Sequence, residues 1–268
     1  MISKYSSSRT LKDNLVLGSL TSFTAGAVNV LSFLLFFSFT SNITGYYAIL
    51  SAELAKGNLF QISIVLSWIF LFFIGGFVSN IIVISTINRG KVYLGHFLPI
   101  AIEILCIGGV GIYGQFLYQE TFFESGVLLS VLLFAMGLQN GFTASISNFA
   151  VKTTHLTGAT TDMAILFALF TQKKFRENGE LKAKAKVLII VSTFYVTGGF
   201  FSAYVQINYG FSSFYVTCAL LVIVMLYDFS RIRSINREFS RPDKPVLETD
   251  GFVNENEQET MPTQTVRL

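Results

Sequence analysis

Cysteine and histidine are scarce in this chain, which argues against a metal-dependent or redox function. The 268 residues include two cysteines and two histidines. Cys106 and Cys218 lie in separate apolar runs with no evident metal or disulfide partner, so we expect both to be packing residues. The common catalytic and phosphate-binding motifs HExxH, GxSxG, CxxC and GxxxxGKS/T are missing as well. We therefore expect a protein that is not an enzyme, with no cofactor, no bound metal and no nucleic-acid partner.

Charged residues are also few, at 13% of the chain, and they leave four long stretches without any charge. A run of about 18 or more apolar residues is a candidate membrane helix, because a bilayer core of about 30 Å needs about 20 helical residues. The uncharged runs are Asn14 to Ala52, Gly57 to Asn88, Ser125 to Val151 and Val187 to Tyr227. With 28 phenylalanines to cover lipid-facing and packing surfaces, the composition predicts an all-α polytopic membrane protein.

The placement of the few charges predicts which loops face the cytoplasm. Lys and Arg gather in the N-terminal segment, at Arg89 and Lys91, from Gln172 to Lys186, and after Ser230. The segment near residue 120 instead carries Glu120 and Glu124. By the positive-inside rule, the basic segments and both termini are cytoplasmic and the segment near residue 120 is outside. The basic N-terminus also fits a signal peptide, but the apolar stretch continues to Phe39, so we interpret it as the first membrane helix.

Short motifs recur in the same order in the two halves of the sequence. TSNITG at residues 40–45 is echoed by TTHLTG at 153–158, and GGFVS at 75–79 is echoed by GGFFS at 198–202. Upstream, AGAVN at residues 25–29 stands at a position like that of NGFTA at 140–144. Three echoes in register predict an internal repeat, with the extra length of the second half taken up by the basic loop.

Each half is expected to hold a long helix, a Thr-Gly motif with a short helix after it, a Gly-Gly-Phe helix and a further helix. The long candidates are residues 15–39, 60–87, 94–118, 127–149, 187–207 and 211–229, and the short ones are 45–56 and 158–172. The predicted divisions are a cytoplasmic N-terminus (1–14), a first membrane repeat (15–118), a second membrane repeat (125–230) and a cytoplasmic tail (231–268). The tail composition is too polar to bury a core and predicts disorder.

The topology depends on whether the two short helices cross the membrane. At about 1.5 Å per residue they reach about 18 and 22 Å, less than a bilayer core of about 30 Å. Eight crossings would place Arg89 and Lys91 outside and Glu120 inside, whereas six place every basic cluster inside. We therefore predict six full spans and two re-entrant half-helices. Because each half has an odd number of spans, the halves form a 3+3 inverted repeat, which is typical of transporters and some channels.

The Thr-Gly motifs are predicted to mark where the half-helices begin, near the middle of the membrane. Thr44 and Thr157 are candidate N-caps, and Gly45 and Gly158 allow close approach of the backbone. Two helix N-termini, each with about half a positive charge, would face each other and attract an anion or a carbonyl dipole. The alternative is a pair of structural hairpins whose threonines only satisfy backbone groups.

Polar residues within the apolar segments form the candidate site. The expected substrate-binding residues are Asn29, Asn42, Thr44, Gly45, Gln139, Asn140, His155, Thr157, Gly158 and Thr161. Acidic residues in such segments are candidates for proton or cation coupling, because a charge in the membrane is costly unless it faces a cavity or a partner. These are Asp162, Glu103 and Glu53. Asp162 lies one turn into its half-helix, Glu103 could pair with His96, and Glu53 could instead be a solvated helix end.

The stretches FTAGAVNVLSF (residues 23–33), TSNITG (40–45) and GLQNGFTASISNFAVKTTHLTGATTDMA (137–164) together resemble the YoaK-like family of bacterial multi-pass membrane proteins, a domain of unknown function. The resemblance covers about residues 15–230. It implies a location in the bacterial cytoplasmic membrane and brings no established substrate. The family pattern commonly has Asp at the position of Asn29 and Asn at the position of Tyr46.

Two classes of function fit these features. The first is a transporter or permease for a small solute, with an anionic solute and proton coupling both left open, and with its site between the two Thr-Gly motifs. The second is a non-transporting sensor or assembly module that acts through partners, using the tail or the lipid-facing aromatic residues. The expected partners are the lipid bilayer and a small-molecule or ion substrate, and a homo-oligomer is left open.

Overall fold

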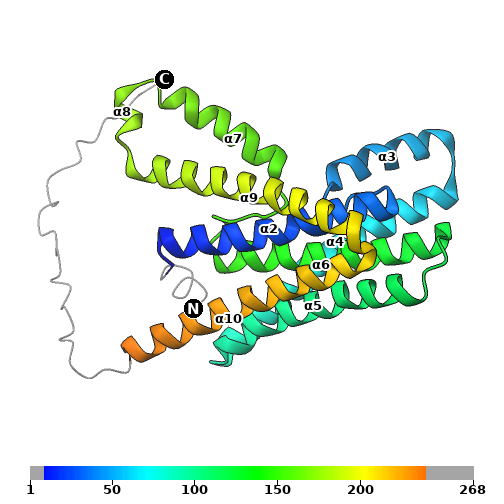
Figure 1. The fold of residues 1–268 in the computed structure, drawn as a ribbon. Helices are drawn as coiled ribbons and strands as arrows, with labels where there is room; N and C mark the ends of the chain where they lie inside the picture. Colours follow the sequence, from blue (N-terminus) through cyan, green and yellow to red (C-terminus); the bar gives the residue numbers. More distant parts are fainter. Residues whose placement is uncertain (1–8, 240–268) are drawn as a thin grey trace, which may run out of the picture.

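The computed structural model describes residues 9–239, and in this part of the chain the regular structure is entirely helical (Figure 1). The long helices are α2 (Leu11–Phe36), α4 (Leu59–Asn88), α5 (Val92–Phe116), α6 (Phe122–Ile146), α9 (Gly179–Tyr209) and α10 (Ser213–Phe239). The shorter elements are α3 (Ile43–Lys56), α7 (Leu156–Leu169), α8 (Lys173–Arg176) and the 3-10 turn η1 (Gly210–Ser212). The all-α prediction is confirmed for this part of the chain.

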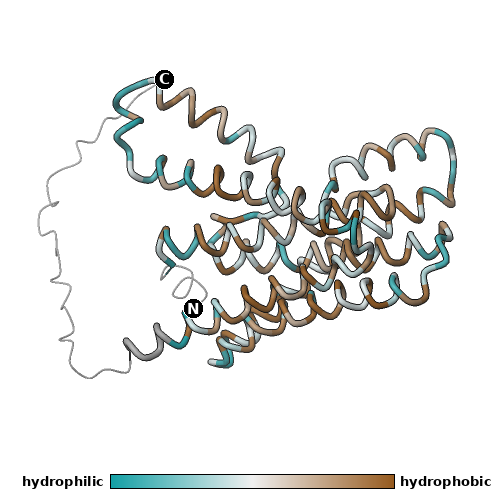
Figure 2. The backbone as a smooth tube through the Cα atoms, in the orientation of Figure 1, coloured by the Kyte–Doolittle hydropathy of each residue, from teal (hydrophilic) through white to brown (hydrophobic). Residues whose placement is uncertain are grey.

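Five stretches of the described chain are long and apolar enough to cross a membrane. Four are the single helices α2, α4, α5 and α6, and the fifth, Gly179–Arg233, contains α9 and α10 joined through η1. Figure 2 shows hydrophobic residues along the length of the bundle and hydrophilic residues gathered at its two ends. Length and composition therefore support an integral membrane protein.

Local capping residues explain where several helices begin and where α3 ends. Thr10 and Asp13 form a capping box at the start of α2, as Thr121 and Glu124 do at the start of α6. The C-cap of α3 is Gly57, whose φ of 69° lies in the left-handed region that favours glycine. These signals place each long helix within a few residues of its predicted position at most ends, although α6 begins five residues and α9 eight residues earlier.

The C-terminal boundary differs from the prediction. Helix α10 continues to Phe239, so residues 231–239 of the predicted tail are helical. Residues 240–268 of the predicted disordered tail lie outside the described residues, as do residues 1–8 of the predicted N-terminal segment.

The two central helices are α2 and α6. In the most apolar 18-residue segment of each helix, 56% of the residues of α2 and 50% of those of α6 are buried. The corresponding share in α4 is 17%, so α4 lies at the periphery. The exposed face of α4 carries the large side chains Phe70, Phe73 and Phe77. In a membrane protein such a face is suited to contact with lipid tails, because no water has to be kept away from it.

Glycines bring α2 against α9 and α6 against α4 with the same pattern. A Cβ atom on Gly26 of α2 would overlap the carbonyl oxygen of Tyr195 in α9, and one on Gly198 would overlap the carbonyl oxygen of Phe23. In the other pair, a Cβ on Gly137 of α6 would overlap the Phe72 carbonyl, and one on Gly75 of α4 would overlap the Phe134 carbonyl. Small residues at such crossings let two helix backbones touch.

These contacts can be compared with the three predicted echoes, and the repeat itself stays a prediction. Gly75 and Gly198, which belong to the two Gly-Gly-Phe motifs, make equivalent helix contacts, and so do Gly26 and Gly137. Asn29 lies three residues after Gly26, and Asn140 lies three residues after Gly137, so the two asparagines occupy equivalent positions relative to these contacts. The predicted echo set residues 25–29 against 140–144, which differs by about one helical turn from the alignment of these glycine contacts.

The two short helices lie on the same side of the bundle and extend toward opposite ends of it (Figure 1). Helix α3 packs beside α4, and α7 packs beside α9. Each has 14 residues, which corresponds to about 21 Å of helix. Most of their side chains are exposed, with Tyr46 buried in α3 and Ala159 and Leu166 buried in α7.

Candidate functional site

Asn29 holds the loop between α2 and α3. Its side-chain oxygen accepts hydrogen bonds from the backbone N–H groups of Thr40 at 2.9 Å and Ser41 at 3.2 Å. It also accepts from the hydroxyl groups of the same two residues, at 3.2 and 3.0 Å. Because Asn29 is only 8% exposed, these bonds are shielded from water, and one amide oxygen fixes the start of the first Thr-Gly motif.

Helix α9 reaches the same loop through Tyr195. The Tyr195 hydroxyl lies 3.3 Å from the hydroxyl of Ser41 and also interacts with the side chain of Asn29. Residues from α2, the α2–α3 loop and α9 therefore form one polar cluster, which we call the Asn29 cluster. Tyr195 was not among the predicted site residues, since a tyrosine within an apolar run gives no sequence signal that it reaches a distant loop.

The N-cap of α3 is Asn42, not the predicted Thr44. The Asn42 side-chain oxygen accepts the backbone N–H of Gly45 at 3.1 Å, and Thr44 lies exposed in the first turn. A Cβ on Gly45 would lie 2.5 Å from the Asn42 amide nitrogen, so glycine leaves room for the cap to fold over the helix end. Asparagine is preferred at this position because its short side chain reaches the free N–H groups.

Helix α7 begins in a similar way, with His155 at the N-cap position in place of the predicted Thr157. The His155 side chain makes no capping hydrogen bond, and a Cβ on Gly158 would overlap its ring. Asn140 of α6 lies near this loop, where its side-chain oxygen accepts the backbone N–H of Thr154 at a long 3.5 Å. The second motif is thus arranged like the first but is held by fewer and weaker hydrogen bonds.

Two of the three threonines of α7 donate their hydroxyl groups to backbone carbonyl oxygens within the helix. Thr161 donates to the carbonyl oxygen of Thr157 at 3.2 Å, and Thr160 donates to that of Leu156 at 2.9 Å. Thr157 and Thr161 are exposed, as Thr44 is in α3. These hydroxyl oxygens retain free lone pairs, so they can still accept a hydrogen bond from a ligand or water.

Gln139 lies away from the two motifs and joins the central helices. Its amide nitrogen donates to the carbonyl oxygen of Thr21 at 2.9 Å and to the hydroxyl of Thr24 at 2.7 Å. Gln139 is 1% exposed, and its Oε1 atom has no hydrogen-bond partner among the described residues. Its side chain therefore connects α6 to α2 rather than lying with the Asn29 cluster.

The three predicted coupling acids lie in different environments. Asp162 forms an ion pair with Lys184 of α9 at 2.8 Å, and Glu53 forms one with Lys56 at 2.7 Å. The hydrogen bond from Lys56 holds the pKa of Glu53 below its usual value. Glu103 is 1% exposed, and its Oε1 atom has no hydrogen-bond partner within the described part of the chain.

The suggested pairing of Glu103 with His96 is wrong, because His96 contacts a different acid. The Nδ1 atom of His96 lies 2.5 Å from Oδ2 of Asp228, and Arg9 lies 2.6 Å from the other carboxylate oxygen. The side chains of Arg9 and Asp228 are each 1% exposed, and this burial lowers the pKa of Arg9. Arg231 and Asp13 form a neighbouring ion pair at 3.1 Å.

This buried charge cluster joins the segment before α2 to α5 and α10, and the sequence prediction missed it. One signal was present, since Asp228 ends the uncharged run and Arg231 follows it by three residues. The partners Arg9 and His96 are separated from Asp228 by 219 and 132 positions, so spacing alone could not identify them.

The fold and these buried polar clusters define the class of the protein. It is an integral membrane protein with several long apolar helices, and its regular structure over residues 9–239 is all helical. Residues 17–227 match a family described as a protein of unknown function, DUF1275, and the chain belongs to that family. Comparisons with curated proteins and with solved structures gave no significant match. The sequence-based resemblance is therefore confirmed as membership of an uncharacterised-domain family, while the YoaK-like name stays a prediction.

Proposed function

We propose that this protein is a transporter or permease for a small solute, with its site between the starts of α3 and α7. The observation that carries the proposal is the matched arrangement of Asn29 and Asn140. Each stands three residues after a glycine, Gly26 or Gly137, that packs against the helix carrying a Gly-Gly-Phe motif. The side-chain oxygen of each asparagine also accepts a backbone N–H in the loop before a short helix. A side chain that holds non-helical backbone in place is expected where that backbone lines a cavity within the membrane.

We further propose that the chain is a 3+3 inverted repeat with six crossings and two re-entrant half-helices. The matched glycine contacts of α2 with α9 and of α6 with α4 support a duplication. The stretch Gly179–Arg233 is about 82 Å long as a helix, far more than one crossing needs, and the break at Gly210 supports two crossings. The positive-inside rule supports a bacterial inner-membrane orientation with both termini in the cytoplasm.

The nature of the helix ends bears on the proposed solute. Asn42 already presents its side-chain oxygen to the N-terminus of α3, whereas α7 has no side-chain cap. An anion would therefore find one occupied and one open helix end, which weakens the argument for a symmetric anion site. Proton coupling is assigned to Asp162 and Glu103. Asp162 can leave its ion pair with Lys184 and take up a proton instead, and Glu103 is a buried carboxyl whose Oε1 atom has no hydrogen-bond partner among the described residues.

Cysteine accessibility tests the proposal without knowledge of the solute. In a background with Cys106 and Cys218 replaced by alanine, Thr44→Cys and Thr157→Cys are treated with a charged thiosulfonate reagent in whole cells and in inverted vesicles. Both cysteines are expected to react, because they line a water-filled path. If neither cysteine reacts with the charged reagent while both react with a membrane-permeant maleimide, the proposal is overturned and the two motifs are structural hairpins.

A further inference from the structure

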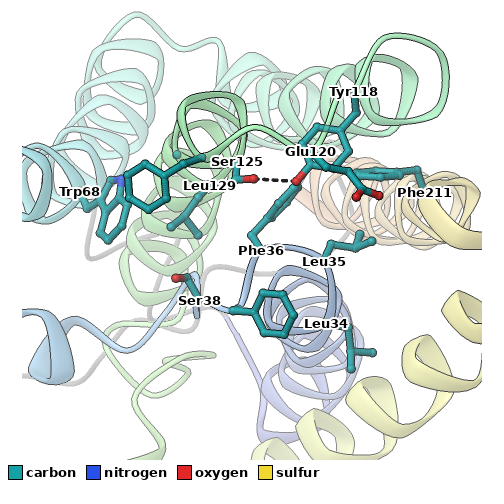
Figure 3. A pocket seen from close by; sticks show the side chains of 13 residues that line it. Leu34, Leu35, Phe36, Ser38, Trp68, Tyr118, Glu120, Ser125, Leu129 and Phe211 are labelled. Carbon is teal, nitrogen blue, oxygen red and sulfur yellow. Dashed lines mark hydrogen bonds between the residues drawn. The ribbon is translucent and has the colours of Figure 1, made fainter.

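A large cavity lies between the C-terminal end of α2, α4, the α5–α6 loop with the start of α6, and η1 (Figure 3). Its volume is about 710 Å³, within the usual range for small-molecule sites. This end of the bundle is opposite to the buried Arg9–Asp228 pair, which lies where α2 begins. Phe37 and Phe122 at its edge are 85% and 67% exposed, so a solute can reach the cavity from outside the bundle.

Aromatic rings supply much of the cavity wall. The Tyr118 ring packs edge-on against Phe36, with centroids 6.0 Å apart, and against Phe211 at 5.2 Å. The Tyr118 hydroxyl is 2.6 Å from that of Ser125, which fixes the ring in place. In Figure 3, Trp68 stands on the side of the cavity opposite to Tyr118 and Phe211. Such faces carry negative electrostatic potential and attract organic cations.

Glu120 gives the cavity a negative charge. Among the described residues that line the cavity, Glu120 is the only charged one, and no lining residue is basic. Glu120 forms no ion pair with another described residue, whereas Glu53 at the same end is paired with Lys56. Figure 3 shows its carboxylate near Phe211, in the group of residues around the cavity. A carboxylate beside aromatic rings favours a positively charged ligand and disfavours an anion.

The cavity also reaches the loop of the Asn29 cluster. Ser38 lines the cavity, and its carbonyl oxygen accepts a hydrogen bond from Ser32 of α2 at 2.8 Å. Two residues later, Thr40 is held by Asn29. A ligand in the cavity would therefore lie beside the loop that leads to the start of α3.

We propose that this cavity binds an organic cation, a solute with an apolar body and a positively charged centre. As the substrate class of a transporter the inference rests on the proposed function, but binding to the cavity can be measured without transport. The solute would place its charge near Glu120 and its body against Trp68, Tyr118 and Phe211.

Trp68 is the only tryptophan of the chain and lines the cavity, so its fluorescence reports binding directly. The full-length protein in lipid nanodiscs is titrated with tetraphenylphosphonium and, separately, with tetraphenylborate, an anion of the same shape. We expect saturable quenching by the phosphonium and a much weaker response to the borate. Glu120→Gln should raise the apparent dissociation constant for the phosphonium about five- to tenfold.

Glu177→Gln is the matched control, because Glu177 is an exposed acid beside α8, outside the cavity. It should bind the phosphonium like the unsubstituted protein. Equal affinity of Glu120→Gln for the cation, or equal binding of both ions, would overturn the inference and indicate an apolar groove filled by lipid or detergent. Failure of the cysteine test at Thr44 and Thr157 with intact phosphonium binding would overturn transport alone.

Discussion

The side-chain oxygen of Asn29 accepts the backbone N–H of Thr40 across 2.9 Å, although the two residues lie on either side of the end of α2. Three further donors from Thr40 and Ser41 share this oxygen. The corresponding bond in the second half, from Thr154 to Asn140, is 3.5 Å long. The two loops therefore have the same kind of anchor but unequal strength, and the loop before α7 is the better candidate for movement.

Because Asn29 makes the stronger hydrogen bonds, removing its side-chain amide should destabilise the protein more than removing that of Asn140. Asn29→Ala should lower the free energy of unfolding by about 2–3 kcal/mol, because buried donors lose their acceptor, whereas Asn140→Ala should cost less than about 1 kcal/mol. Unfolding in mixed detergent micelles, followed by circular dichroism, measures both. Asn29→Asp keeps an acceptor oxygen and should retain most of the stability. A larger loss for Asn140→Ala than for Asn29→Ala would contradict the assignment of Asn29 as the stronger anchor.

The glycine crossings predict that even a methyl group is too large at these positions. Gly26→Ala and Gly137→Ala should each destabilise the protein by about 2 kcal/mol or more, because the new Cβ overlaps the carbonyl oxygen of Tyr195 or Phe72. Thermal melting of the purified protein measures the loss. Gly109→Ala is the matched control, since a Cβ there has no neighbour within 4 Å, and it should leave the melting temperature equal or higher. A melting temperature as low for Gly109→Ala would show that helix flexibility matters rather than the crossing.

The two aspartate ion pairs should differ strongly in their contribution to stability. Asp228→Asn leaves the buried Arg9 guanidinium without a counter-charge and should cost about 3–5 kcal/mol. Asp162 and Lys184 are 42% and 55% exposed in their side chains, so Asp162→Asn should cost less than about 1 kcal/mol. The yield of monodisperse protein and its melting temperature distinguish the two. Asp162→Asn thus remains suited to a transport assay, in which it should abolish or uncouple flux.

The six-crossing topology predicts opposite labelling of two loops. Lys56→Cys, at the C-terminal end of α3, should react with an impermeant maleimide from outside the cell, whereas Lys174→Cys in α8 should react from the cytoplasmic side. Whole cells and inverted vesicles give the two readings. If both cysteines are labelled from the cytoplasm, the short helices cross the membrane and the inverted repeat is lost.

The sequence by itself determined which segments are helices. The long runs without charge predicted α2, α4, α6, α9 and α10, and the apolar stretch around Glu103 predicted α5, because the preference of a segment for a membrane depends on its own residues. The Gly-Gly-Phe echo also singled out Gly75 and Gly198, whose contacts in the structure are equivalent, since a helix crossing requires a small residue wherever it occurs. Both properties are local and can be read without the partner.

Only the tertiary structure decided which distant residues meet. The N-caps moved from Thr44 and Thr157 to Asn42 and His155, because the path of each loop fixes which side chain reaches the helix end. Asp228 contacts Arg9 across 219 positions. Trp68 and Glu120 line one cavity because packing brings α4 and the α5–α6 loop to the same end of the bundle. Such contacts depend on the register of whole helices, which no short stretch of sequence encodes.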